Sequence, residues 1–115
     1  MEIKRTSGDQ RFSSVVEHNG TLYFAGLTSS KKTFEEQLLD ILTEFETRAK
    51  NAGSDRSRIL SALVILKDMK DFAELNKVWI DWFGGKDLPT RATFQAEMAR
   101  EDILVEIVFT AATGA

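Results

Sequence analysis

Apolar residues recur with the spacing of a helix between Thr33 and Gly53, where the chain reads TFEEQLLDILTEFETRAKNAG. Thr33 and Glu36 form a T-x-x-E capping box at the start of this segment, and Gly53 is a residue at which helices commonly stop. The spacing therefore predicts an α-helix. Its apolar face carries Phe34, Leu38, Ile41, Leu42, Phe45 and Ala49.

A second helical repeat follows later in the chain. Asp68 or Asp71 is in position to cap its start, and Gly84-Gly85 ends it. Asn76 lies on the apolar face of this helix, where an asparagine most often bonds a nearby carbonyl at the edge of the core. The residues expected to face the core are Phe72, Leu75, Trp79 and Phe83.

The remaining apolar segments have the patterns of β-strands. Two runs between Arg11 and Leu27 flank Asn19-Gly20, which is a hairpin signal because both turn residues tolerate positive φ. The run from Ile59 to Lys67 is apolar on both alternating faces, as a central strand is. Two strands close the chain, at about Arg91–Met98 and Ile103–Ala111.

The order of these elements is ββαβαββ, which predicts one α+β domain over residues 1–115, with two helices on one face of a mixed sheet. In the last strand apolar residues line both faces, with Ile107 on one side and Val108 on the other. Two helices cover only one face, so the second apolar face would stay exposed, which monomers rarely tolerate. The pattern therefore predicts an oligomer that packs its sheets together.

Composition narrows the classes of function. The 115 residues carry a net charge of -3 with scattered Lys and Arg, whereas nucleic-acid binding usually needs a clustered basic surface. The absence of cysteine excludes disulfides, thiolate catalysis and Cys-based metal sites, and one histidine, His18, cannot build a His-rich metal site. The chain has no apolar signal segment or membrane-spanning run, so we expect a cytoplasmic protein.

Two charged residues lie within predicted strands, where a charged side chain calls for an explanation. Arg91 begins the polar stripe of its strand, and Glu106 lies between aliphatic residues in the last strand. We expect both on the second, partner-facing side of the sheet. A hairpin that turns near Arg100-Glu101 would set Glu106 opposite Gln95 and leave Arg91 about four residues away, on the order of 13 Å at ~3.3 Å per residue. The two side chains would then meet only across a subunit boundary or on a shared ligand.

Simpler interpretations stay open for the same residues. Arg91 follows Pro89 at a strand end, where a solvated edge charge is common. Glu106 is either a structural ion-pair partner or a functional carboxylate, since a buried charge is costly unless it is paired or hydrogen-bonded. Packing explains Trp79 and Trp82 more simply than nucleotide stacking does, because no basic groove accompanies them.

Three segments together resemble a known family. DMKDFAELNKVWIDWF, PTRATFQA and LVEIVFTAA, in this order and at this spacing, are similar to the signature of the RidA/YjgF family of reactive-intermediate deaminases. The similarity extends over nearly the whole chain, and the P-x-R and V-E-I motifs are specific in combination. The resemblance implies subunits with a chorismate-mutase-like fold that form a homotrimer with a ligand cleft at each interface.

The resemblance also implies roles for individual residues. Arg91 would bind the carboxylate of a small 2-imino or 2-enamino acid. The planar guanidinium, with several donors in a fork, suits this bidentate contact better than a lysine ammonium does. Glu106 would hold the water that attacks the imine carbon, and the products would be a 2-keto acid and ammonia. The reaction would need no metal or organic cofactor. The other residues that the resemblance assigns to substrate binding are Asn76, Phe12, Gly26 and Thr93.

The chain departs from the family around the expected ligand. Ala25 and Leu27 stand where RidA-type members carry the Ser and Gln of Ser-Gly-Gln. Thr93 stands where a cysteine is common, and Phe12 where the residue is often Tyr. Because the carboxylate anchor is kept while its surroundings change, the pattern is typical of a paralogous branch of the family.

Three functions follow from the resemblance. The first is an enamine/imine deaminase that acts on small unstable imino acids such as 2-aminoacrylate, and the retention of Glu106 with Arg91 favours it. The alternative is a non-catalytic trimeric module that binds a small carboxylate metabolite in the same cleft, which the loss of the Ser and Gln groups favours. RNA cleavage or inhibition of translation, also associated with the family, is disfavoured by the acidic balance and the single histidine.

Overall fold

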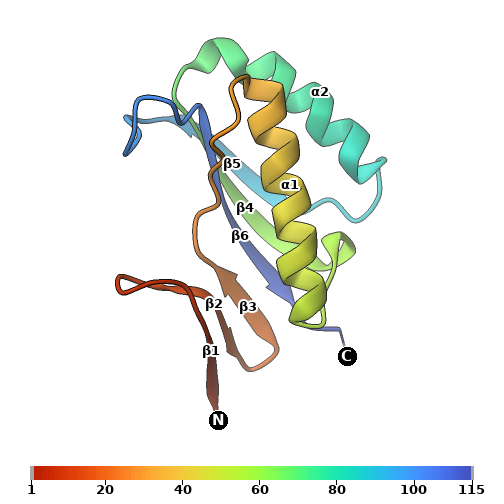
Figure 1. Ribbon diagram of the computed structural model, residues 1–115. Helices are drawn as coiled ribbons and strands as arrows, with labels where there is room; N and C mark the ends of the chain where they lie inside the picture. The colour runs from red at the N-terminus through yellow and green to blue at the C-terminus, as the bar shows by residue number, and fades with distance from the viewer. Residues whose placement is uncertain (1, 115) are drawn as a thin grey trace.

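The protein is built in two layers, a β-sheet and a pair of helices (Figure 1). A computed structural model describes residues 2–114. Short 3₁₀ turns at Arg56–Arg58 and Met69–Asp71 precede the fourth strand and the second helix. In chain order the elements are β1 (Ile3–Ser7), β2 (Ser13–His18), β3 (Thr21–Phe24), α1 (Phe34–Asn51), β4 (Ile59–Leu66), α2 (Phe72–Phe83), β5 (Thr90–Gln95) and β6 (Val105–Ala112).

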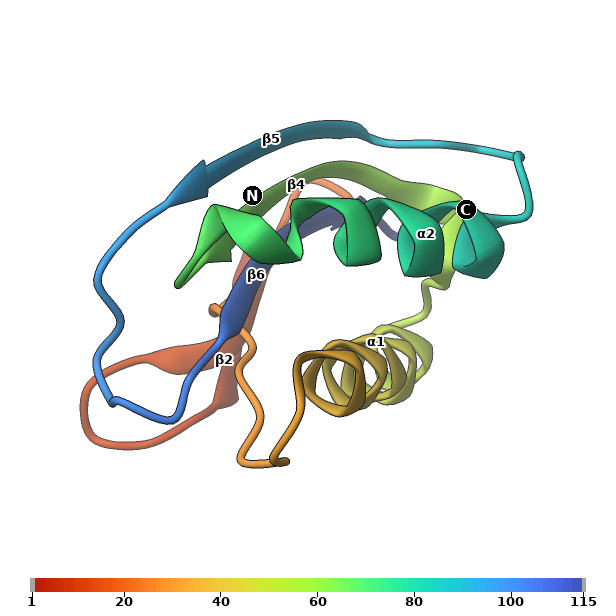
Figure 2. The ribbon, with the colours of Figure 1, turned by 90° about the horizontal axis from the view of Figure 1, so that it is seen from above.

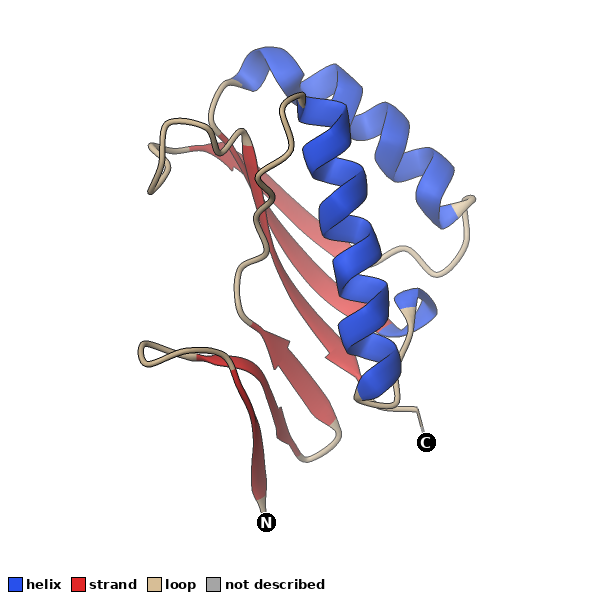
Figure 3. Ribbon diagram, in the orientation of Figure 1, coloured by secondary structure: helices blue, strands red, loops and turns tan. Residues whose placement is uncertain are grey.

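Both predicted helices are confirmed, with their boundaries (Figure 3). At the start of α1 both hydrogen bonds of the capping box form: Thr33 Oγ1 accepts from the Glu36 N–H at 3.2 Å, and Glu36 Oε1 accepts from the Thr33 N–H at 3.1 Å. Asp68 caps the 3₁₀ turn before α2, and Asp71 precedes α2 without a side-chain capping bond. Gly84 ends α2 in the left-handed region, with a φ of 62°.

The structure has one strand more than the sequence pattern predicted, so the order is βββαβαββ. The β2–β3 hairpin is confirmed, and its turn residues Asn19 and Gly20 have φ of 54° and 79°. The additional strand, β1, is exposed along its whole length, so no alternation of apolar and polar residues marks it. It forms because its backbone pairs antiparallel with β2 at the edge of the sheet.

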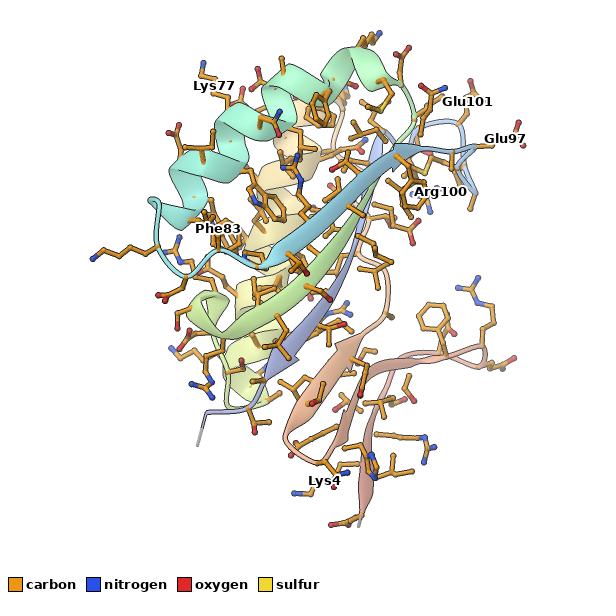
Figure 4. All side chains as sticks on the ribbon, turned by 180° about the vertical axis from the view of Figure 1, so that it is seen from behind. Lys4, Lys77, Phe83, Glu97, Arg100 and Glu101 are labelled. Carbon is orange, nitrogen blue, oxygen red and sulfur yellow. The ribbon has the colours of Figure 1, made fainter. Side chains whose placement is uncertain are left out.

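The strand order in the sheet is β1-β2-β3-β6-β4-β5. β6 lies in the centre, antiparallel to β3 and β4, and β5 is an edge strand parallel to β4. The predicted hairpin between the last two strands is therefore wrong. The chain instead leaves β5 through a loop that carries Glu97, Arg100 and Glu101 (Figure 4) and enters the middle of the sheet. Pro89 directly before β5 suits an edge position, because proline cannot donate to a ladder.

The core lies between the helices and one face of the sheet (Figure 2). Trp79 and Trp82 pack as expected, with the Trp79 ring nearly parallel to that of Phe109 and the Trp82 ring edge-on to that of Phe45. Phe72 was expected to face the core but is 38% exposed, because it is the first residue of α2. The largest fully buried side chains include Phe45, Phe109, Leu22, Leu38, Ile41, Leu42, Leu66, Leu75 and Ile107.

The opposite face of the sheet carries no helix, as the two-faced strand patterns predicted (Figure 2). Large apolar side chains remain exposed there, among them Tyr23 at 51%, Leu63 at 44% and Phe94 at 44%. We call this surface the open face; its other members, by strand register, include Ile65 and Val108. An exposed apolar surface of this kind usually marks an interface. None of the helices within residues 2–114 has the length and apolarity needed to cross a membrane.

Candidate functional site

Arg91 lies on the helix side of the edge strand β5. It is level with Ala62 in the parallel β4–β5 pair, and Ala62 is buried beneath the helices. Residues that are level on neighbouring strands share a face, so Arg91 points towards α2. The prediction that Arg91 and Glu106 share the open face is therefore wrong. It assumed a β5–β6 hairpin, which would have given the two strands a different register.

Helix α2 holds the Arg91 guanidinium. Arg91 Nη2 donates a hydrogen bond of 2.7 Å to Asn76 Oδ1. The guanidinium carbon lies 5.2 Å from the ring centre of Trp79 and 5.8 Å from that of Phe72, within the range of cation–π attraction. Phe72, Asn76 and Trp79 are spaced i, i+4 and i+7, so one face of the helix supplies all three. We call these three residues and Arg91 the arginine cluster.

No carboxylate among residues 2–114 balances the charge of Arg91. The side chain is half-buried, and within residues 2–114 it forms no ion pair. Loss of water lowers the pKa of Arg91 from its ordinary value, because burial disfavours the charged form. An arginine nevertheless stays protonated at neutral pH. A bound carboxylate would supply the missing negative charge through two parallel hydrogen bonds.

The next residues of the same stripe have different surroundings. Thr93 Oγ1 is buried and has no hydrogen-bond partner within residues 2–114. Buried hydroxyls are nearly always hydrogen-bonded, so this oxygen is available to a ligand or a neighbouring subunit. Gln95 Oε1 accepts from the Met69 N–H at 3.1 Å, which ties the end of β5 to the 3₁₀ turn before α2. Thr93 thus offers a ligand a buried oxygen that no other described residue uses, whereas the Gln95 amide oxygen is already occupied.

Glu106 lies on the open face, level with Ile65 of β4. Its carboxylate approaches Gly26 in the loop after β3. Two backbone hydrogen bonds, of 2.8 and 3.1 Å, join Leu27 to Ile107 and hold this loop against β6. Within the described part of the chain the Glu106 carboxylate forms no hydrogen bond or ion pair with another residue. The intrachain ion pair that a purely structural role would require is thus not formed.

A pocket of about 350 Å³ adjoins Gly26. Phe12 forms part of its wall and is 50% exposed. Gly26 borders both this pocket and the Glu106 carboxylate, whereas Phe12 borders the pocket alone; we call Gly26 and Glu106 the glutamate cluster. Helix α1 also lines the pocket, through Asp40, Glu44 and Arg48.

The structure thus divides the predicted site residues into two groups on opposite sides of the sheet. Arg91 and Asn76 come together on the helix side, and Glu106 and Gly26 come together on the open side. Sequence reasoning assigned Phe72 and Trp79 to the core and missed their contact with Arg91. Their signal is the helical spacing that they share with Asn76. No group of three or more metal-ligating side chains gathers in residues 2–114.

Comparison with known proteins gives the family of the chain. The model of the family described as Endoribonuclease L-PSP matches residues 3–113. A RutC family protein of Haemophilus ducreyi is 38% identical over 112 residues, which cover 96% of each chain. The chain belongs to the YjgF/RutC family. The RutC family protein YoaB of Escherichia coli is 36% identical over 113 residues, which cover 97% of this chain and 99% of YoaB.

A solved structure agrees with this membership. The YjgF-family protein of Neisseria meningitidis superposes with a TM-score of 0.96 at 34% identity, over 100% of this chain and 98% of the other. In this YjgF/RutC-family chain Ala25 and Leu27, which the resemblance sets in the places of a Ser and a Gln, have no polar side chains to offer. Leu27 is 3% exposed and packs in the core, and Ala25 contributes a backbone N–H that donates to the Ser14 carbonyl at 2.9 Å.

Proposed function

We propose that this YjgF/RutC-family chain hydrolyses small reactive 2-imino and 2-enamino acids, such as 2-aminoacrylate, to 2-keto acids and ammonia. The observation that carries the proposal is the arginine cluster. A half-buried guanidinium is held in a fixed orientation by Asn76 and two aromatic rings, yet it lacks a carboxylate partner in residues 2–114. Such a group is suited to binding a small carboxylate from outside the chain.

The positions of the two clusters support a homotrimer with the site between subunits. A contact between identical patches would pair each cluster with its own copy. A head-to-tail contact brings different faces together, and it forms a ring where the rotation between subunits closes. A head-to-tail ring of three subunits would set the arginine cluster of one chain beside the glutamate cluster of the next. It would also cover the apolar open face. Sedimentation equilibrium should then report about three times the chain mass of 12.9 kDa, and a stable monomer at micromolar concentration would contradict it.

In the proposed reaction Arg91 binds the carboxylate of the imino acid, and Glu106 of the partner subunit holds a water molecule. Glu106 accepts a proton from the water while the water oxygen bonds to the imine carbon, and the same carboxyl then delivers this proton to the nitrogen, which restores the carboxylate. The resulting carbinolamine loses ammonia, as its hydroxyl becomes the carbonyl of the 2-keto acid. Because such imines hydrolyse readily in water, positioning the imine and one water supplies most of the acceleration. The unpartnered Thr93 hydroxyl is available to hydrogen-bond the ligand.

One observation favours a second function, a non-catalytic module that binds small carboxylates. Ala25 and Leu27 bring no polar side chain to the region where related proteins carry Ser and Gln, so the surroundings of the imine nitrogen are less polar. This module would use the arginine cluster in the same way but would not accelerate hydrolysis. The description of the matched family names an endoribonuclease, but the net charge of -3 and the single histidine disfavour RNA cleavage by this chain.

The deciding experiment generates 2-aminoacrylate with a dehydratase and follows the release of the keto acid with and without the protein. We expect acceleration by the wild type and loss of both turnover and 2-oxobutanoate binding in Arg91→Ala. Arg91→Lys should also fail, because it keeps the charge but not the fork. Loss of a charge-assisted contact of this kind typically costs about 2–5 kcal/mol, which is more than tenfold in affinity.

A matched control is Arg56→Lys, because Arg56 also stacks on a tryptophan, 5.0 Å from the ring centre of Trp82, but contacts neither cluster. It should bind and react like the wild type. Glu106→Gln should keep keto-acid binding and slow turnover by about 10²-fold or more. If Arg91→Ala and Arg91→Lys both behave like the wild type, the deaminase proposal is wrong. Binding through Arg91 without any acceleration would instead identify the carboxylate-binding module.

A further inference from the structure

Gly26 lies where a side chain would collide with Glu106. A Cβ atom built on Gly26 would overlap Glu106 Oε2 and would lie 3.0 Å from Cδ and 3.3 Å from Cγ. All three atoms belong to one side chain, and they are the nearest that the Cβ would meet within residues 2–114, apart from the neighbours of Gly26 in the chain. The space that glycine leaves free is therefore occupied by the carboxylate of Glu106.

The backbone does not explain the glycine. The glycines with positive φ in residues 2–114 are Gly20, Gly53, Gly84 and Gly85, and Gly26 is not among them. An alanine at position 26 could therefore adopt the existing backbone without strain. What it could not do is share the space of the Glu106 carboxylate. Glycine is required at this position because the Glu106 carboxylate occupies the space that a Cβ atom would fill.

The backbone pairing makes this clearance specific for one location of the carboxylate. Leu27 and Ile107 are joined by a pair of hydrogen bonds, of 2.8 and 3.1 Å, and both side chains are buried on the helix side. The residues next to them, Gly26 and Glu106, therefore project together on the open side. Because both segments are held in this way, neither backbone can retreat cheaply from an added methyl group. The end of the flexible glutamate side chain is the part that would move.

We propose that Gly26 is a positioning residue for Glu106: its missing Cβ holds open the place in which the carboxylate must lie to orient water. This inference rests on the proposed function, and it gives Gly26 a role distinct from contact with the substrate. The carboxylate lies against the loop after β3, and other residues of 2–114 leave its lone pairs unused. It can thus accept hydrogen bonds from a water molecule in a defined direction.

The test is a double-mutant cycle between positions 26 and 106, read in three ways. The variants are Gly26→Ala, Glu106→Ala and the two together. We expect Gly26→Ala to lower kcat at least tenfold while the KM and the affinity for 2-oxobutanoate change by no more than twofold, since Arg91 is untouched. In the Glu106→Ala background the added methyl group has nothing to displace, so Gly26→Ala should change kcat by less than twofold.

A control at another glycine separates an effect on the position of the Glu106 carboxylate from a general loss of protein stability. Gly85→Ala introduces strain at a φ of 76° but meets no atom within 4 Å, so it should lower the melting temperature and leave kcat unchanged. If Gly26→Ala alone fails to fold, the double variant should fold again, because the three atoms nearest to the added methyl group all belong to the Glu106 side chain. The crystal structure of Gly26→Ala should show the carboxylate displaced from the loop after β3.

The outcomes distinguish this inference from the proposed function. If the wild type does not hydrolyse the imine, the deaminase proposal is refuted. The position of the Glu106 carboxylate in the Gly26→Ala crystal would then still decide whether Gly26 leaves the space in which that carboxylate lies. An active wild type with an equally active Gly26→Ala would overturn the inference alone. So would a Gly26→Ala structure in which the carboxylate stays in place and the loop moves, or equal effects of Gly26→Ala in the presence and absence of the Glu106 side chain.

Discussion

Among the polar side chains of residues 2–114, Gln37 is the one whose replacement should destabilise the fold most. It is fully buried on α1 and uses its whole amide. Nε2 donates to the carbonyl oxygens of Lys31 at 2.9 Å and Asp102 at 2.8 Å, and Oε1 accepts from the Leu104 N–H at 2.9 Å. One side chain therefore ties the segment after β3 and the segment before β6 to the same helix. These segments flank the place where Gly26 meets Glu106.

The expected magnitude follows from the three backbone groups that Gln37→Leu would leave without their partner. An unsatisfied buried group costs about 1–3 kcal/mol. The Leu104 N–H is half-buried and should account for most of the loss, while the carbonyls of Lys31 and Asp102 belong to exposed residues and can turn to water. Leucine recovers part of the loss by burying apolar area. We expect the free energy of unfolding to fall by about 1–3 kcal/mol.

Urea denaturation measures this loss, at one fixed protein concentration because oligomers gain stability with concentration. A fall of this size should also lower the melting temperature by roughly 10 °C for a domain of this length. The matched control is Gln95→Leu, which removes one hydrogen bond at an exposed position and should stay within about 1 kcal/mol of the wild type. If Gln37→Leu also stays within 1 kcal/mol, the reasoning about its three bonds is refuted.

Two further predictions concern the arginine cluster and acid stability. Phe72→Leu should weaken 2-oxobutanoate binding about two- to tenfold, because it removes a ring that faces Arg91. The control Ile80→Ala changes an exposed residue of the same helix and should leave the affinity unchanged. Equal affinities of the two variants by calorimetry would contradict this prediction. The Ser57 hydroxyl and N–H donate to Asp55 and lower the pKa of that carboxyl. Its stabilising contribution is therefore present above about pH 4 and lost as the pH falls through the lowered pKa. Ser57→Ala should be less stable than the wild type at pH 7, and the difference should shrink towards pH 3; a difference independent of pH would count against this assignment.

The helices, the β2–β3 hairpin and the apolar open face could be read from the sequence, because local patterns determine them. The capping box of Thr33 and Glu36, the Asn19-Gly20 turn and the 3.6-residue spacing of α1 each act over a few residues. The two-faced pattern of β6 likewise indicated that one face of the sheet would lack helices. Arg91, Glu106 and Asn76 also stood out in the sequence, as polar residues within strand and helix patterns, but the roles assigned to them came from the resemblance.

Only the tertiary structure decided which strand pairs with which and which stripe of β5 faces the helices. A period of two separates Arg91 and Thr93 from Ala92 and Phe94 but does not say which pair points inwards. Burial alone favours the apolar pair, yet that pair lies on the open face, which is itself apolar, and Arg91 turns towards α2. Strand pairing depends on contacts between residues far apart in the chain, and β6 enters the sheet between β3 and β4 through such contacts. That insertion puts Arg91 and Glu106 on opposite sides of the same sheet.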